Sequence, residues 1–410
     1  ANSYPDYPSD LKNSVNTLLK EHGIYGGLEP ALVLAVSDDR ALAQRDNGEI
    51  VTLHIDDSGW ARLYINVDRR GPPPQSMQDI IGVGNIIRLR REDDKWLLAQ
   101  LPEIQGAVVS IDPDNGSVRA LVGGFDFYRN QYNHALQAAR QPGSGFKPFV
   151  YSSAIAAGVT PADIFMDAPL VFDDENLESQ YRPDNDNNRY NGPTRLREAL
   201  YRSINLVSMR VLLKVGAGNV MEHVKKFGFD TNNFPRNTQL AIGGGTMAVT
   251  PIDMARAYTV FANGGYLIDP NIVVSINDAD GNEIFRANHL QVCRECDEQE
   301  IGDTFTDPEL EPASLEALFA KELAAETASG MGEQPSIDMQ DEPSAEEQAA
   351  GNGDTNEASV DSTNAITPAP EPIYAKRVVD ERNVFIMNSM LQDVIKRGTG
   401  RSARRLARGD

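Results

Sequence analysis

The sequence has little cysteine, few aromatic residues and no long apolar run. Its 410 residues include two cysteines, two tryptophans and five histidines, and aromatic residues make up 7% of the chain. Two cysteines are too few for a disulfide scaffold, and the scattered histidines show no metal-ligand spacing. Since no apolar run is long enough, we expect no membrane-spanning helix. The first residues also lack a signal-peptide pattern, so the chain is either soluble or an excised part of a longer protein.

Basic residues are outnumbered, and the imbalance is local. The chain carries 60 acidic and 38 basic residues, a formal charge of −22. Residues 297–372 contain 20 of the acidic residues and one basic residue, Lys321, whereas the remainder is close to neutral. Because one-signed charge and few aromatics leave too little apolar surface to offset chain entropy, we predict a disordered acidic insertion at 297–372. The shortage of basic charge argues against a nucleic-acid partner.

Short apolar runs and turn residues define the N-terminal third of the chain. Residues 1–30 are predicted to be a linker with one short amphipathic helix. Residues 31–104 are predicted to form a small all-β, OB-like barrel, because five apolar runs are separated by turn residues. No basic-aromatic stripe accompanies this pattern, so we reject the nucleic-acid use of an OB fold. The runs lie at 31–36, 50–55, 61–67, 85–89 and 96–101.

The rest of the chain indicates an α+β fold, with a mostly antiparallel sheet packed with helices. A strand–turn–strand pattern opens it, helical patterns dominate from residue 137 onward, and a strand returns near 271–277. Capping residues place helices at 250–263 and 381–397. The first part of this domain is expected at 105–296 and the second part, beyond the insertion, at 373–410.

The best candidate nucleophile is Ser144, three residues before Lys147. On a helix this spacing places both side chains on one face. A serine hydroxyl needs an adjacent base, and lysine can be that base only when its pKa falls from about 10.4 to about 7–8. The positive potential of a helix N-terminus favours this fall. Pro148 predicts that a helix begins at about Ser144, because proline is tolerated only in the first turn.

A second candidate element is the tripeptide Ser203-Ile204-Asn205. A hydroxyl and an amide two residues apart, on a loop between helices, can relay protons and hold a substrate amide. The pattern is common, and Ser275-Ile276-Asn277 also matches it. The Ser203 copy is the one expected between two helices, at 195–201 and 206–215. Gly243-Gly244-Gly245 lacks the lysine of a phosphate-binding loop, so a tight turn is expected there.

Together these residues resemble the transpeptidase part of the bifunctional class A penicillin-binding proteins of the 1A type. The resemblance is strong over 105–289 and 378–410 and looser over 31–104. It rests on several words in the family's order and spacing. These are Gln105-Gly106-Ala107, Leu121-Val122-Gly123-Gly124, Arg140-Gln141-Pro142-Gly143-Ser144, Lys147-Pro148-Phe149, Ser203-Ile204-Asn205, Thr250-Pro251, Phe261-Ala262-Asn263-Gly264-Gly265 and Arg397-Gly398-Thr399-Gly400.

The resemblance implies a serine D,D-transpeptidase that cross-links peptidoglycan. Ser144 would attack the penultimate D-Ala carbonyl of a stem peptide, and Lys147 would take the hydroxyl proton. Ser203 would relay a proton to the departing D-Ala, and Asn205 would hold the acyl-chain amide. An amine of a neighbouring stem peptide would then form the cross-link, and β-lactams would acylate Ser144. No cofactor and no metal are implied.

The family also implies a location, partners and two alternatives. We expect the periplasmic side of the inner membrane, with an N-terminal anchor and a glycosyltransferase half that this sequence does not contain. The β domain is a candidate docking site for a regulatory protein. A serine β-lactamase remains an alternative, although it would not need the β-rich segment 31–104. A penicillin-recognising module without turnover is the other alternative.

Cys293 and Cys296 form a lone Cys-x-x-Cys. Because zinc takes four ligands and the chain has two cysteines, a zinc site is not expected within one chain. A periplasmic location favours a local disulfide, and two free thiols are the alternative.

The family's third motif, Lys-Thr-Gly or Lys-Ser-Gly on a sheet-edge strand, does not occur in this sequence. In the family it follows the stretch that corresponds to 397–400, and it supplies one N–H of the oxyanion hole. Losing one such donor costs about 10²–10³ in rate. We therefore predict that a fluorescent penicillin labels this chain slowly or not at all, as read on a denaturing gel. Rapid stoichiometric labelling of Ser144 would contradict this prediction.

Overall fold

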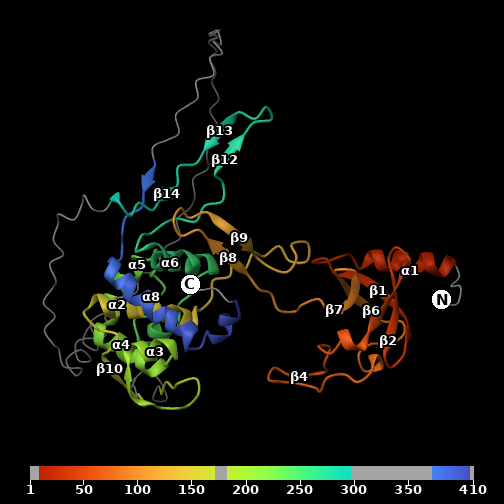
Figure 1. Ribbon diagram of the computed structural model, residues 1–410, viewed down its shortest axis with the longest axis horizontal. Coiled ribbons are helices and arrows are strands. Elements are labelled where there is room, and N and C mark those ends of the chain that lie inside the picture. The colour runs from red at the N-terminus through yellow and green to blue at the C-terminus, as the bar shows by residue number, and fades with distance from the viewer. Residues whose placement is uncertain (1–8, 171–181, 297–371, 407–410) are drawn as a thin grey trace, which may run out of the picture. The chain divides into compact units, whose positions relative to one another are not determined.

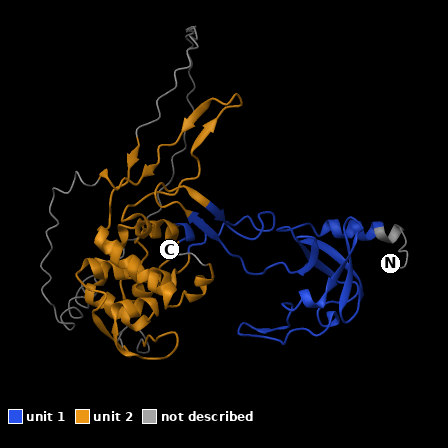
Figure 2. Ribbon diagram, in the orientation of Figure 1, with its two compact units in different colours: residues 1–110, 120–139, 250–252 blue, residues 111–119, 140–249, 253–410 orange. Residues whose placement is uncertain are grey.

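The computed structural model describes residues 9–170, 182–296 and 372–406 (Figure 1). The chain divides into two compact units (Figure 2). The first contains residues up to 110 with 120–139 and 250–252, and the second contains most of the rest. The insertion predicted at 297–372 lies outside the described residues, apart from residue 372. The domain boundaries expected from the sequence stay predictions.

The first unit contains helix α1, Ser9–Glu21, and an antiparallel sheet with strand order β3-β2-β1-β6-β7. Apolar side chains such as Val33, Leu53 and Leu89 form its core, because alternate residues of a strand point to the same face. The sheet strands are β1 Glu29–Val36, β2 Arg40–Arg45, β3 Ile50–His54, β6 Ile86–Glu92 and β7 Lys95–Ala99.

Three expectations for this unit were wrong. Strand β2 was missed because alanines and arginines dominate it, and these are weak strand signals. The run at 61–67 is not a strand of the sheet, since β4, Tyr64–Asn66, pairs with β5, Arg69–Arg70, as a separate exposed ribbon. The sheet is also not a closed barrel. Within the described ranges, the edge strands β3 and β7 approach each other without a hydrogen-bonded ladder.

The second unit is built around helix α2, which packs against α4, α5 and α8 (Figure 1). Nearly every side chain of α2 is buried, as expected for a central core helix. Phe149 of α2 lies at the centre of an aromatic cluster, with its ring 5.0 Å from Phe227 and 5.5 Å from Phe261. The helices are α2 Lys147–Ala156, α3 Leu196–Tyr201, α4 Asn205–Val215, α5 Ala217–Lys225, α6 Pro251–Asn263 and α8 Glu381–Lys396.

The strands beyond residue 105 pair as short two-stranded ribbons. Most are antiparallel, as expected, but β14 and β15 are parallel. The pairs are β8 Val108–Ile111 with β9 Val118–Val122, β10 Ile164–Asp167 with β11 Gly192–Arg195, β12 Ser275–Asn277 with β13 Glu283–Arg286, and β14 Leu290–Gln291 with β15 Ile373–Tyr374. Cys293 and Cys296, just after β14, form the expected disulfide.

A buried polar cluster joins three of the helices. The Ser152 hydroxyl of α2 lies 2.9 Å from Nε2 of His223 in α5 and donates to Oδ1 of Asn383 in α8, also at 2.9 Å. Burial lowers the pKa of His223 to about 4, so its ring is neutral at neutral pH. Such satisfied polar contacts fix the relative rotation of helices that apolar packing alone would leave free to slide. Across the described helices, none combines the length and apolarity needed to cross a bilayer.

Candidate active site

Ser144 and Lys147 lie at the start of the central helix. A 3₁₀ turn, Gly143–Phe146, leads directly into α2, and the Lys147 N–H donates to the Ser144 carbonyl. The predicted helix start at about Ser144 is therefore a 3₁₀ turn, with Pro148 in the first turn of α2 as expected. The Ser144 side chain is exposed, whereas Lys147 is 1% exposed. One turn thus separates an accessible hydroxyl from a buried amine.

A glycine turn holds the loop around Ser144 in place. Gly243 has a φ of +64° and its carbonyl accepts from the Gly143 N–H at 3.1 Å. A Cβ at Gly243 would lie 2.3 Å from the Gly143 carbonyl oxygen, so no side chain fits there. Gln141 donates to the Gly245 carbonyl at 2.6 Å. Gly243-Gly244-Gly245 is therefore the tight turn that the sequence predicted.

The Ser203-Ile204-Asn205 turn surrounds the Lys147 amine. Ser203 and Ile204 lie between α3 and α4, as predicted, and Asn205 is the first residue of α4. The Lys147 Nζ donates to the Ser203 carbonyl at 2.7 Å, to Ser203 Oγ at 3.0 Å and to Asn205 Oδ1 at 2.7 Å. Ser203 has a φ of +57°, a left-handed conformation that costs a non-glycine residue about 1–3 kcal/mol. This conformation lets both its carbonyl and its hydroxyl face the same amine.

Burial gives the Lys147 amine the properties of a base. Desolvation lowers its pKa to about 7, and the carboxylate of Asp186 opposes this fall. Its three hydrogen-bond acceptors are uncharged oxygens that orient the amine. They favour the ammonium form, which has three N–H donors, so the low pKa reflects desolvation. A pKa of about 7 leaves roughly half of the side chain neutral at neutral pH. The amine can therefore accept a proton at physiological pH.

The structure brings all four predicted site residues into one unit. Lys147 bonds Ser203 and Asn205 directly, and Ser144 lies one turn from Lys147. In the described part of the chain, none of the hydrogen bonds of the Lys147 amine goes to Ser144. Within the same ranges, no group of three or more His, Cys, Asp or Glu side chains is arranged to hold a metal ion.

Helix α8 and the residues that follow it hold the end of α3, which leads into the Ser203-Ile204-Asn205 turn. Arg197 of α3 pairs with the buried Asp393 of α8 at 3.0 Å, and the Thr399 N–H donates to the carbonyl of Tyr201, the last residue of α3. A Cβ on Gly398 would lie 2.2 Å from that Tyr201 carbonyl oxygen. The glycine at 398 is therefore required for this close approach, which fixes the end of α3 just before Ser203.

Sequence reasoning missed a polar loop that supports the turn. Asn185 and the buried Asp167 were not singled out. Their connection to the site depends on contacts between residues about 20 positions apart. The asparagine-rich stretch at 184–191 was the available signal, but asparagines of this kind are also typical of ordinary turns.

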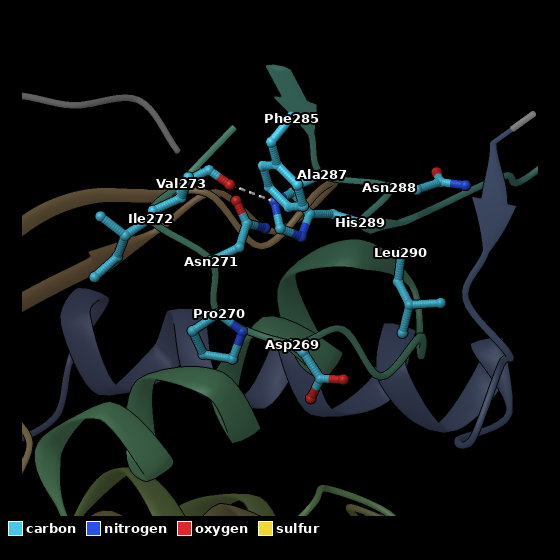
Figure 3. Close-up of a pocket in the computed structure, with 10 residues that line it drawn as sticks. All are labelled: Asp269, Pro270, Asn271, Ile272, Val273, Phe285, Ala287, Asn288, His289 and Leu290. Carbon is cyan, nitrogen blue, oxygen red and sulfur yellow. Dashed lines mark hydrogen bonds between the residues drawn. The ribbon is translucent and has the colours of Figure 1, made fainter. Parts of the chain in front are cut away.

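A separate cavity of about 420 Å³ lies beside the β12–β13 ribbon. Its lining includes Pro270, Asn271, Phe285 and His289, whose ring nitrogen lies 2.9 Å from the Val273 carbonyl oxygen (Figure 3). None of the four predicted site residues lines it. The hollow is therefore distinct from the candidate active site.

Comparison with known proteins identifies the family. A model of the penicillin-binding protein transpeptidase domain matches residues 106–309, and a model of the penicillin-binding protein OB-like domain matches residues 4–104. The chain belongs to the penicillin-binding proteins. The α+β transpeptidase fold and the OB-like domain expected from the sequence are thereby confirmed.

Relatives of the 1A type resemble this penicillin-binding chain over most of its length. Penicillin-binding protein 1A of Pseudomonas aeruginosa is 40% identical over 386 residues, which cover 94% of this chain and 43% of the relative. The Escherichia coli K12 protein of that name is 40% identical over 293 residues, covering 71% and 34%. The crystal structure of penicillin-binding protein 1A from Haemophilus influenzae aligns with a TM-score of 0.71 and 26% identity, covering 99% of this chain and 51% of that one. The chain thus spans less than half the length of these two curated relatives.

We predict that Asp186 holds the pKa of Lys147 higher than burial alone would. Its carboxylate favours the ammonium form, so D186N should move the pKa of Lys147 below about 7. The measurement is an NMR titration of the chain carrying ¹³C-labelled lysine, with the Lys147 signal assigned by its loss in K147R. D230N, which removes an exposed carboxylate from another loop, should leave the midpoint unchanged. A midpoint that rises or stays fixed in D186N would contradict the assignment.

Proposed function

We propose that this chain carries the serine centre of a D,D-transpeptidase that cross-links peptidoglycan stem peptides. We also propose that β-lactams inhibit it by acylating the same serine, Ser144. One observation carries the proposal: the buried Lys147 amine has a pKa of about 7 and lies one turn from the exposed Ser144. A lysine that lies next to an accessible hydroxyl and is partly neutral at physiological pH is suited to activate a nucleophile.

In the acylation step, the neutral Lys147 amine takes the proton of the Ser144 hydroxyl. The serine oxygen attacks the carbonyl carbon of the penultimate D-Ala, and the peptide C–N bond breaks. The departing D-Ala amine receives the proton from Lys147 through the Ser203 hydroxyl, which lies 3.0 Å from the Lys147 Nζ. The product is an ester of Ser144, and Lys147 is again neutral.

In the second step, an amine of a neighbouring stem peptide attacks that ester. Lys147 takes a proton from the attacking amine, the ester C–O bond breaks, and the proton returns to Ser144. A new amide bond, the cross-link, is formed. With a β-lactam the ring C–N bond breaks instead, and the leaving amine stays tethered to the acyl group, so it hinders access of the acceptor amine.

Asn205 combines two functions in this proposal. Its Oδ1 accepts from Lys147 at 2.7 Å, whereas its Nδ2 donates to the Asp184 carbonyl at 3.3 Å. The second contact is long for a hydrogen bond, so an acyl-chain carbonyl can replace it at small cost. Asn205 then holds the substrate amide while continuing to orient the base.

The proposal extends to the location and a protein partner. We place the site on the periplasmic side of the inner membrane, where stem peptides are cross-linked and where the Cys293–Cys296 disulfide is stable. The first unit, which contains the five-stranded sheet, is proposed to bind a regulatory protein. Its β4–β5 ribbon supports this, because Leu63, Tyr64 and Val67 are 76%, 72% and 90% exposed, and exposed apolar clusters are typical of interaction sites.

We predict that S144A and K147A each lower the rate of cross-linking by the full-length gene product by about 10³-fold or more. Cross-linked stem peptides are quantified by mass spectrometry after incubation with peptidoglycan precursor. S203A should slow the reaction, whereas S275A, which alters a matching Ser-x-Asn tripeptide on the exposed β12, should not. Rapid turnover of penicillin would favour a β-lactamase instead, and acylation without any cross-link would favour a binding module.

A further inference from the structure

A buried carboxyl group lies at the end of strand β10. Asp167 is fully buried, and its oxygens accept from Asn185 Nδ2 at 2.7 Å, from the Asn191 N–H at 2.8 Å and from Asn191 Nδ2 at 2.6 Å. Burying such a group is costly unless hydrogen bonds satisfy it. Its three donors belong to two asparagines of one loop, so the group organises that loop.

Asn185 also contacts the Ser203-Ile204-Asn205 turn. Its Oδ1 accepts from the backbone N–H groups of Asn205 at 3.1 Å and of Leu206 at 3.2 Å. These are the first amides of α4, which have no partner inside the helix. The residue at the N-cap position, Ile204, has no side-chain acceptor. Asn185 therefore supplies the cap that serine, threonine or aspartate supplies in other helices.

Asn191 ties the other end of the turn to the same carboxyl group. Its Oδ1 accepts from the guanidinium of Arg202 at 3.3 Å, and Arg202 directly precedes Ser203. The β10–β11 ladder places Asp167 opposite Gly192, so Asn191 reaches Asp167 from the adjacent position. Both flanks of the Ser203-Ile204-Asn205 turn are thus connected to one buried residue.

We propose that Asp167 and Asn185 are positioning residues that hold this turn around the Lys147 amine. Asn205 Oδ1 and Ser203 Oγ must both stay within hydrogen-bond distance of Lys147 Nζ, although Ser203 adopts a strained backbone conformation. The capped start of α4 fixes Asn205. The contact between Asn191 and Arg202 holds the neighbouring Ser203 in its left-handed backbone conformation. This inference rests on the proposed transpeptidase function, because it assigns these residues to the support of that reaction.

The first test concerns the geometry alone. In N185A, the amides of Asn205 and Leu206 lose their acceptor, so their hydrogen exchange should accelerate by about 10-fold or more. N187A is the matched control, since Asn187 lies in the same loop and, in the described part of the chain, its Oδ1 accepts from the Arg189 N–H rather than from an amide of the turn. Unchanged exchange in a folded N185A protein would overturn the inference.

The second test asks whether Asn185 acts through Asn205. In the full-length gene product, N185A should lower the second-order rate of penicillin acylation by about 10- to 100-fold, the range caused by slight misplacement of reacting groups. In an N205A background the same change should cost less than about 3-fold, because its target is already gone. If N185A lowers the rate by the same factor with and without N205A, Asn185 has a purely structural role and the inference is overturned.

D167N provides a second variant in case N185A does not fold. D167N replaces one carboxylate oxygen, an acceptor, by an NH₂ donor that faces the donors of Asn185 and Asn191. It should therefore lower the acylation rate, as N185A does. The double variant should be little slower than N185A alone. An unchanged rate in folded D167N would overturn the inference. If the unaltered gene product is not acylated at all, the proposed function fails, whereas the exchange measurement still decides whether the loop holds the turn.

Discussion

The candidate site depends on one interaction, the burial of the Lys147 amine against the Ser203-Ile204-Asn205 turn. A lysine at the protein surface is a strong base but is almost wholly protonated at neutral pH. Burial of this amine lowers its pKa to about 7, and three uncharged acceptors hold it in one orientation. The same contacts that bury the amine therefore make it available as a base.

The rest of the second unit keeps this interaction in place. The aromatic cluster around Phe149 anchors α2, the helix that begins at Lys147. The glycine turn at Gly243 fixes the loop that carries Ser144. The pair between Arg197 and Asp393 holds the end of α3. Each of these contacts joins segments far apart in the sequence, so the site requires the complete helical unit.

Much of this site could be predicted from local sequence. The spacing of Ser144 and Lys147, the proline at 148 and the position of Ser203 between two helices all depend on nearby residues. Helices α6 and α8 were also predicted within a residue, because caps and helical periodicity mark their ends. The roles of the four site residues stay proposals.

What the sequence could not provide depends on tertiary contacts. The buried Asp167 and its asparagines form no local motif, since their bonds join strand β10, a loop and the start of α4. Strand β2 lacks a strong apolar pattern, and the exposed ribbon β4–β5 has one without joining the sheet. The acidic segment at 297–372 was predicted to be disordered, and that interpretation stays a prediction.

The most direct test of the account is the pH dependence of the second-order rate of penicillin acylation in the full-length gene product. Because the neutral form of Lys147 is the proposed base, the rate should rise with pH and show an inflection near pH 7. An acid limb with its inflection above about pH 9, or no dependence between about pH 5 and 9, would contradict a buried neutral lysine as the base.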